Sequence, residues 1–391
     1  VVGINPAPGG APPADVKSGS EGLVGLVPSA VPASDGECAA CEGCTHSLSW
    51  YGGEEVRFNG EKYRRDKGAS SATITRACTA GETIAEVDKP YVKFPCVPGV
   101  QKHGIECGLE RAEDRIQKNI RAVQRLADEC GLDGVATRMW LEHVESELPP
   151  GLEGEGTRVN QSGVFSSRAK GISLSNLCLD NRKLCDTVLQ VRSEQVRLAA
   201  LFEFLLCGQD RHAQNVFIDE NASLTLIDND QMLGWQGGSP SDKGDCQLNS
   251  VFFPSTLESW RIRFSGAMGH LDVRCHLADD GSVPLPPKTQ ECAKALSEMS
   301  AETIQSSYGL RKLAFATSLK QRAADLLEVG LLEALQRGLA QERELFVQKQ
   351  GDPEMFHWDD LSAAQRGPIK HFRGSMYRPL EPPNCNKERI S

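Results

Sequence analysis

The stretch from residue 192 to residue 230 constrains the fold most, because its hydrophobic pattern changes from a helical to a strand period within a few residues. Residues 192–208 are strongly apolar on one side, which predicts a buried helix that ends at Gly208. Two short strands follow, Val216-Phe217-Ile218 and Leu224-Thr225-Leu226-Ile227, around a turn at residues 219–222. A helix followed by a β-hairpin predicts a protein of the α+β class.

Polar residues come directly before and directly after this hairpin in the sequence. The string Gln209-Asp210-Arg211-His212-Ala213-Gln214-Asn215 precedes it, and Asp228-Asn229-Asp230 follows it. A hairpin returns the chain to its starting point, so we expect Asp210, Asn215 and Asp228 to lie close together. Phosphoryl transfer needs a carboxylate near the attacking hydroxyl and oxygen ligands for a divalent metal, and these residue types supply both. The alternative interpretation is a polar connection whose side chains only cap backbone groups.

The same segment resembles the atypical branches of the kinase-like superfamily. DRHAQN is similar to the D-R-H-x-x-N loop of phosphatidylinositol 3- and 4-kinases. The loop, the hairpin and L-I-D-N-D together resemble more closely the secretory-pathway kinases of the four-jointed and Golgi casein kinase group, which typically have D-N-G or D-N-E at that point. The resemblance implies that Asp210 is the catalytic base, that Asn215 and Asp228 are metal ligands, and that Arg211 and His212 shape the loop. It also implies ATP with Mg or Mn as cofactor, and a lumenal, glycosylated protein.

The order of predicted elements agrees with a two-lobed protein-kinase-like fold. A small antiparallel-sheet N-lobe is expected at residues 48–145 and a mainly helical C-lobe at residues 146–350, between an extended Gly/Pro-rich arm at 1–47 that ends in a Cys cluster and a second arm at 351–391. Strands are predicted at residues 55–58, 63–65, 72–76, 83–94 and 135–140, and helices at 106–130, 192–208, 287–299 and 310–348. After a Gly- and Glu-rich loop at 150–158 the chain is expected to be mainly helical.

A kinase-like N-lobe needs a lysine on a strand to neutralise phosphate charge, and a glutamate on the following helix to hold that lysine. Lys89, before a proline, and Lys93, in Tyr91-Val92-Lys93-Phe94, both fit. Glu106, Glu110 and Glu113 are the candidate partners, although each also fits a solvated helix face. The sequence leaves both choices open.

Fourteen cysteines, an even number, favour internal disulfides and an oxidising compartment over buried free thiols in an intracellular protein. Cys38, Cys41 and Cys44 are spaced too compactly for a structural zinc site, so a disulfide knot is favoured. Asn160-Gln161-Ser162 and Asn221-Ala222-Ser223 both match the N-glycosylation pattern. We expect the secretory-pathway lumen or the extracellular space, or alternatively an organelle lumen after removal of a transit peptide.

The net charge of -10 argues against nucleic-acid binding, and no apolar run reaches the roughly 18 residues of a transmembrane helix. The first functional interpretation is a kinase that transfers the γ-phosphate of ATP to a hydroxyl of a secreted protein or glycan. The second is an inactive kinase-fold subunit whose terminal arms contact partner subunits. A phosphoinositide kinase is less favoured, because residues 231–242 contain no basic residue to hold a lipid headgroup.

Overall fold

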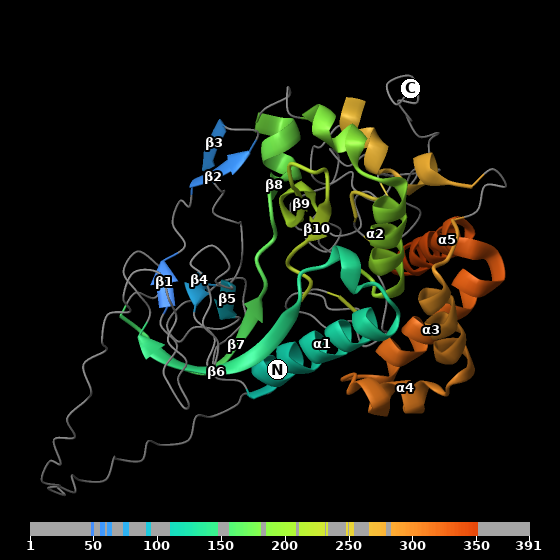
Figure 1. Ribbon diagram of the computed structural model, residues 1–391. Helices are drawn as coiled ribbons and strands as arrows, with labels where there is room; N and C mark the ends of the chain where they lie inside the picture. The colour runs from blue at the N-terminus through green and yellow to red at the C-terminus, as the bar shows by residue number, and fades with distance from the viewer. Residues whose placement is uncertain are drawn as a thin grey trace, which may run out of the picture. The chain divides into compact units, whose positions relative to one another are not determined.

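The described fold has two parts (Figure 1). One is an antiparallel sheet that is covered by one long helix, and the other, larger part is built around further helices. The computed structural model describes residues 48–50, 55–58, 61–64, 73–77, 91–94, 110–147, 156–180, 185–208, 211–230, 232–233, 248, 250–253, 266–278 and 283–350. All of these belong to one compact unit, residues 36–391. The expected α+β class is confirmed. The arms at 1–47 and 351–391 lie outside the described residues.

The larger sheet has five strands in the order β1-β4-β5-β7-β6, and every neighbouring pair is antiparallel. Its strands are β1 (Leu48–Trp50), β4 (Thr73–Ala77), β5 (Tyr91–Phe94), β7 (Arg158–Ser166) and β6 (Met139–Glu147). A separate hairpin joins β2 (Glu55–Phe58) and β3 (Glu61–Arg64). The predicted strands at 55–58, 63–65 and 72–76 correspond to β2, β3 and β4, and the described end of the one expected at 83–94 is β5.

Two expectations for the segment after residue 130 are wrong. The strand expected at 135–140 is split, because Asp133–Val135 form a 3-10 helix and β6 begins only at Met139. The mainly helical part begins later than residue 158, because residues 158–166 form β7, which lies between β5 and β6 in the sheet. The sequence of β7 has little strand periodicity, and backbone pairing with both neighbours stabilises it instead. The sheet therefore reaches Ser166, beyond the lobe boundary expected at residue 145.

Helix α1 (Glu110–Glu129) packs against β6 and β7, and its buried residues face the main core. Val164 of β7 belongs to that core and is paired across the sheet with Lys93 of β5 and Leu141 of β6. Directly paired residues on neighbouring strands project to the same face of a sheet. Lys93 therefore projects from the face that α1 covers.

The part of the chain beyond the sheet is built around α2 (Ser193–Leu205), which is buried along most of its length. It packs on α5 (Leu313–Gln350), and α5 also contacts α3 (Pro287–Glu298) and α4 (Ala301–Tyr308). The predicted helices at 106–130, 192–208, 287–299 and 310–348 correspond to α1, α2, α3 and α5. The sequence analysis missed α4, although Ser300 caps its start and Gly309, with a φ of 65°, ends it.

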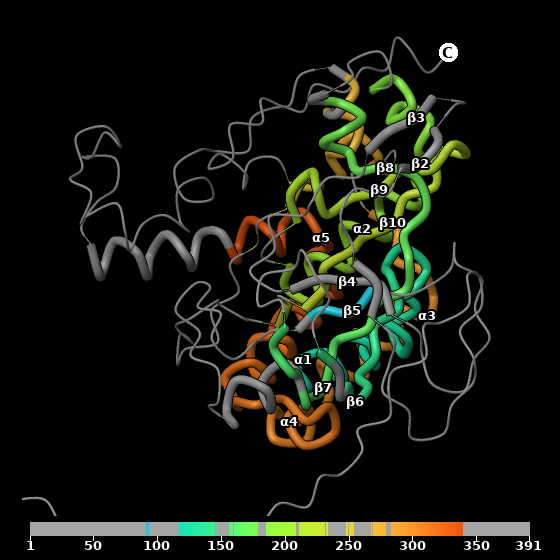
Figure 2. The backbone as a smooth tube through the Cα atoms, turned by 90° about the vertical axis from the view of Figure 1, so that its left-hand side faces the viewer, coloured from blue at the N-terminus to red at the C-terminus, as the bar shows by residue number. Residues whose placement is uncertain are grey.

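The predicted hairpin is confirmed as β9 (Val216–Ile218) and β10 (Leu224–Leu226), joined in a second sheet by β8 (Ile172–Ser173). It lies beside α2 in both views (Figures 1 and 2). Ile218 and the other inward-facing residues of these strands are fully buried. The hairpin is therefore anchored in the main core.

Every cysteine in the described ranges is disulfide-bonded. Cys130, just after α1, pairs with Cys292 of α3, and Cys178 pairs with Cys185, while Cys207 and Cys275 are also in disulfides. The Cys38 cluster is outside these ranges. No helix among the described residues is both long and apolar enough to cross a bilayer. The disulfides are compatible with a lumenal or extracellular location.

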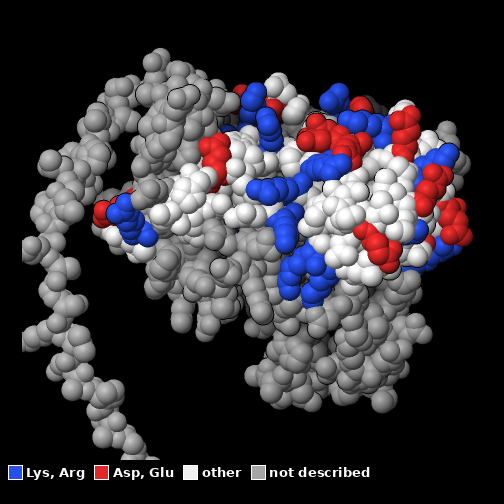
Figure 3. Space-filling model, turned by 90° about the horizontal axis from the view of Figure 1, so that it is seen from below, with Lys and Arg blue, Asp and Glu red and all other residues white. Residues whose placement is uncertain are grey.

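Figure 3 shows the charged side chains on one face of the described part of the chain. Several Lys and Arg side chains lie next to one another in a band through the middle of this face, and Asp and Glu side chains lie on either side of the band.

Gly171, which precedes β8, provides a test of how tightly the second sheet is packed. Its φ is 77°, and a Cβ there would lie 2.0 Å from the carbonyl oxygen of Ile218. Gly309 has a similar φ of 65° but open space around it. Both Gly→Ala variants carry the backbone strain of a positive φ, about 1 kcal/mol, but only Gly171→Ala also collides with backbone. We expect Gly171→Ala to lower the free energy of unfolding by at least about 2 kcal/mol more than Gly309→Ala in urea titrations. Equal losses would contradict the packing of β8 on β9.

Candidate functional site

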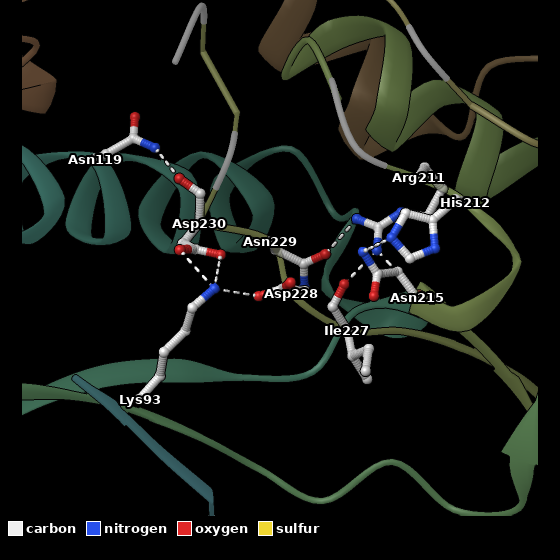
Figure 4. A network of polar contacts seen from close by, with 9 residues as sticks. All are labelled: Lys93, Asn119, Arg211, His212, Asn215, Ile227, Asp228, Asn229 and Asp230. Carbon is white, nitrogen blue, oxygen red and sulfur yellow. Dashed lines mark hydrogen bonds and ion pairs between the residues drawn. The ribbon is translucent and has the colours of Figure 1, made fainter. Parts of the chain in front are cut away.

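The base of the β9–β10 hairpin brings two separate polar segments together. The backbone N–H of Ile227 donates to the carbonyl of Asn215 over 3.1 Å, so the residues on either side of the hairpin are neighbours. Asp228 then adopts a left-handed backbone conformation, with a φ of 60°. Such a conformation is uncommon outside glycine and is concentrated at functional sites. The backbones of Asn215 and Asp228 are therefore near each other, but the Asp228 carboxylate is directed at Lys93 and the Asn215 side chain lies beside His212 (Figure 4). Asp210 lies outside the described residues.

Lys93 of β5 reaches from the larger sheet to this hairpin (Figure 4). Its Nζ lies 2.6 Å from Oδ1 of Asp228, and 3.1 and 3.0 Å from the two carboxylate oxygens of Asp230. The three side chains are largely buried, with exposed fractions of 11% for Lys93, 21% for Asp228 and 13% for Asp230. Of the two lysines that the sequence proposed, Lys93 therefore contacts Asp228. Lys89 lies outside the described residues.

Asp230 is a site residue that the sequence analysis did not single out. Asn229 is fully buried, and the aspartates on either side of it contact the same lysine. The meeting of two carboxylates with one ammonium depends on β5, which is far away in the sequence. A local motif therefore gave no reason to prefer Asp230.

Helix α1 contacts the same segment through an amide. Asn119 donates from Nδ2 to the backbone carbonyl of Asp230 over 2.6 Å. Of the expected glutamates, Glu110 and Glu113 lie in the first turn of α1, but their side chains are outside the described part of the chain, as is all of Glu106. Asn119 lies beside Ile120 on the inner face of α1, so a polar residue within an apolar stripe was the available signal.

Arg211 holds the loop and the segment after the hairpin together. Its Nε donates to Oε1 of Glu203 in α2 over 2.9 Å, and its Nη2 donates to Oδ1 of Asn229 over 2.5 Å. Its Nη1 donates to the carbonyls of Asn215, over 3.0 Å, and of Ile227. Arg211 and Glu203 are almost completely buried, so each depends on the other for its charge balance. The loop-shaping role implied for Arg211 thus has a physical basis.

Gly208 leaves room for this ion pair. The sequence predicts Gly208 as a helix terminator, but the structure adds a steric reason, because a Cβ there would lie 1.9 Å from Oε2 of Glu203. The backbone N–H of Gly208 also donates to the carbonyl of Glu203 over 2.8 Å. A side chain at position 208 would therefore displace Glu203 from Arg211.

His212 is neutral at physiological pH. Burial, together with the positive charge of Arg211, lowers its pKa to about 4 even though Asp228 opposes the shift. Its Nδ1 accepts from the backbone N–H of Gln214 over 3.2 Å, and its Nε2 lies 3.3 Å from Nδ2 of Asn215. His212 therefore supports the turn that positions Asn215.

Burial and the shared lysine move the pKa values of the two aspartates in opposite directions. Burial raises the pKa of Asp228, but the Lys93 ammonium more than compensates and lowers it to about 2. Burial and the neighbouring charge of Asp228 raise the pKa of Asp230 to about 6. Burial opposes the charge of Lys93 as well, but the two carboxylates raise its pKa above the ordinary value. Asp228 is consequently the permanently ionised partner.

The donor set suits a hard divalent cation. Two carboxylates already bind an ammonium group. Asn215, the other metal ligand that the sequence suggested, lies beside Arg211 and His212 (Figure 4). Mg²⁺ commonly uses one or two carboxylates together with water and phosphate oxygens. No group of three or more His, Cys, Asp or Glu side chains placed to hold a metal occurs among the described residues.

No protein-family model matches this chain, and a search of curated proteins finds no match either.

Removing one partner of the buried Arg211–Glu203 pair is expected to destabilise the fold strongly. Arg211→Met leaves Glu203 buried without its partner, so we expect a loss of about 3 to 5 kcal/mol in the free energy of unfolding, measured by urea titration. The double variant Arg211→Met/Glu203→Gln should recover part of that loss, because both charges are removed. Lys294→Met, at an exposed pair with Glu298, is the control and should change little. A loss for Arg211→Met no larger than for this control would contradict the assignment.

The two aspartates should differ in how their stability effects depend on pH. The folded protein retains a proton on Asp230 up to about pH 6, whereas the unfolded chain loses it near pH 4, so ionised Asp230 destabilises the fold at pH 8. We expect Asp230→Asn to be more stable than the wild type at pH 8 by about 1 to 3 kcal/mol, and this gain to shrink at pH 5. The lowered pKa of Asp228 gives the opposite sign: its stabilisation is present above pH 4, so Asp228→Asn should be less stable at both pH values. Guanidinium titrations at pH 5 and 8 measure both differences, and a gain for Asp230→Asn that does not depend on pH would refute the assignment.

Proposed function

We propose that this protein is a two-lobed, kinase-like phosphotransferase of the secretory pathway, which transfers the γ-phosphate of ATP to a hydroxyl of a secreted protein or glycan. The observation that carries the proposal is the contact between Nζ of Lys93 and Oδ1 of Asp228 at 2.6 Å. A strand lysine that meets the aspartate after a hairpin, across a junction between a sheet and a helical part, is the arrangement that nucleotide phosphates and their metal require.

Each residue of the candidate site has its own role in the proposed reaction. Lys93 would neutralise charge on the phosphates of ATP, and Asp228 and Asn215 would hold Mg²⁺ or Mn²⁺, which supplies charge neutralisation of the phosphates. Asp210 would accept the proton of the attacking hydroxyl while that oxygen forms a bond to the γ-phosphorus and the bond to the β-phosphate oxygen breaks, releasing ADP. Arg211 and His212 would hold the loop in shape.

The compartment is part of the same proposal. Disulfides at all six described cysteines require an oxidising environment for their formation, and the chain contains eight further cysteines. A lumenal or extracellular enzyme meets this requirement. The acceptor would accordingly be a secreted molecule.

A second candidate is an inactive kinase-fold subunit, and one observation favours it. Lys93 already binds both Asp228 and Asp230, and Asn119, rather than a glutamate, is the described α1 residue that contacts this segment. The lysine and Asp228 thus have partners without a nucleotide. In this case the arms at both ends of the chain would contact partner subunits.

Nucleotide binding tests both candidates. ATP with Mg²⁺ or Mn²⁺ at about 100 times its dissociation constant should stabilise the wild type by about 2.7 kcal/mol, a melting-temperature rise of roughly 5 °C by differential scanning fluorimetry. Lys93→Met and Asp228→Ala should abolish the rise, whereas Lys118→Met, on the exposed face of α1, should retain it. Asp210→Asn should bind ATP yet release no ADP, which separates binding from transfer. An unchanged melting temperature of the wild type with ATP and either metal would argue against an active kinase.

A further inference from the structure

The tip of the β9–β10 hairpin presents one of the two glycosylation patterns in an exposed turn. Asn221 is solvent-exposed, and Ala222 after it has a positive φ of 55°. The carboxylate of Asp219 accepts from the backbone N–H groups of Asn221, over 2.9 Å, and of Ser223, over 2.8 Å. These two hydrogen bonds hold the backbone of the turn in place. The Asn221 side chain is left at the surface.

We propose that Asn221 is an N-linked glycosylation site. Its carboxamide nitrogen would form a bond to the anomeric carbon of an oligosaccharide activated as a lipid pyrophosphate, while the bond from that carbon to the pyrophosphate breaks and the nitrogen loses one proton. The residue between Asn221 and Ser223 is alanine, as the acceptor pattern allows. The proposal does not depend on the kinase-like function.

The disulfides supply an independent reason to expect the required compartment. Lipid-linked glycosylation occurs in the same oxidising lumen in which disulfides form. Cys130–Cys292 joins residues 162 positions apart in the sequence, and Cys178–Cys185 joins residues 7 positions apart. The disulfides therefore include both a long-range and a local bridge. A chain that forms its disulfides in this lumen is also exposed there to the enzyme that attaches N-linked glycans.

The second pattern, at Asn160, has a different setting. Asn160 is exposed, but it lies within β7 and is paired with Glu145 of β6 in a regular antiparallel ladder. An acceptor asparagine lies in a surface loop or turn, and Asn221 meets this condition directly. We therefore assign the glycan to the hairpin tip.

The glycan at this position would leave the candidate active site open. Strands β9 and β10 each have three residues, so the tip is about 10 Å from the strand ends that carry Asn215 and Asp228. The turn and the open end of the hairpin lie at opposite ends of its two strands. Glycosylation should therefore leave the rise in melting temperature with ATP and metal, or its absence, unchanged.

The test is expression of the full chain behind a cleavable secretion signal in mammalian cells. We expect treatment with a peptide N-glycosidase to increase gel mobility and to convert Asn221 to aspartate, as read by peptide mass spectrometry. Asn221→Gln and Ser223→Ala should both abolish this glycan. Ser223→Thr keeps the acceptor pattern and should keep the glycan.

Asn160→Gln is the matched control, because it removes the other pattern and should leave the modification of Asn221 intact. Glycans are added to the nascent chain, so a variant that is retained in the cell is assayed in the whole-cell lysate. An unmodified Asn221 peptide from wild-type protein would overturn the proposal. So would a glycan mass found only at Asn160.

Discussion

The candidate site depends first on one buried guanidinium. In an interior of low dielectric constant, a charged group needs both a counter-ion and partners for its N–H groups. Arg211 finds the counter-ion in Glu203 of α2 and its remaining partners in Asn215, Ile227 and Asn229. These partners come from a helix, a loop and the segment after a hairpin. The charge balance of one residue therefore fixes three elements relative to one another.

A second charge balance connects this assembly to the sheet. Asp228 and Asp230 would repel each other in a largely buried site without a shared cation, and Lys93 provides it. Lys93 lowers the pKa of Asp228, whereas burial and the charge of Asp228 raise the pKa of Asp230. Under the proposed function, a metal-bound nucleotide would replace Lys93 at Asp228 and offer its phosphates to Lys93 in return. Under the same proposal, each of these charged groups would keep an oppositely charged partner in the bound state.

Helix α1 is tethered at the end far from its first turn. The Cys130–Cys292 disulfide joins it to α3, and the hydroxyl of Tyr308 in α4 donates to Glu129 over 2.6 Å. Arg125 lies over the ring of Tyr308, 4.9 Å from its centre. Since α1 also supplies Asn119 to the Asp230 carbonyl, these contacts connect the helical part with the candidate site. The position of α1 is thus determined by covalent and polar contacts as well as by its apolar face.

The sequence by itself determined the elements whose signals are local. Alternation in residues 216–226 and the turn residues between them predict the hairpin, and the polar residues at its base identify Asn215 and Asp228 as neighbours, because a hairpin must return the chain to its start. Only the tertiary structure decided that β7 enters the sheet, that Lys93 contacts the aspartates, and that Asp230 and Asn119 belong to the site. The disulfide partners were decided in the same way. Each of these depends on contacts between residues far apart in the chain, where packing and charge balance select the partner and local periodicity carries no information about it.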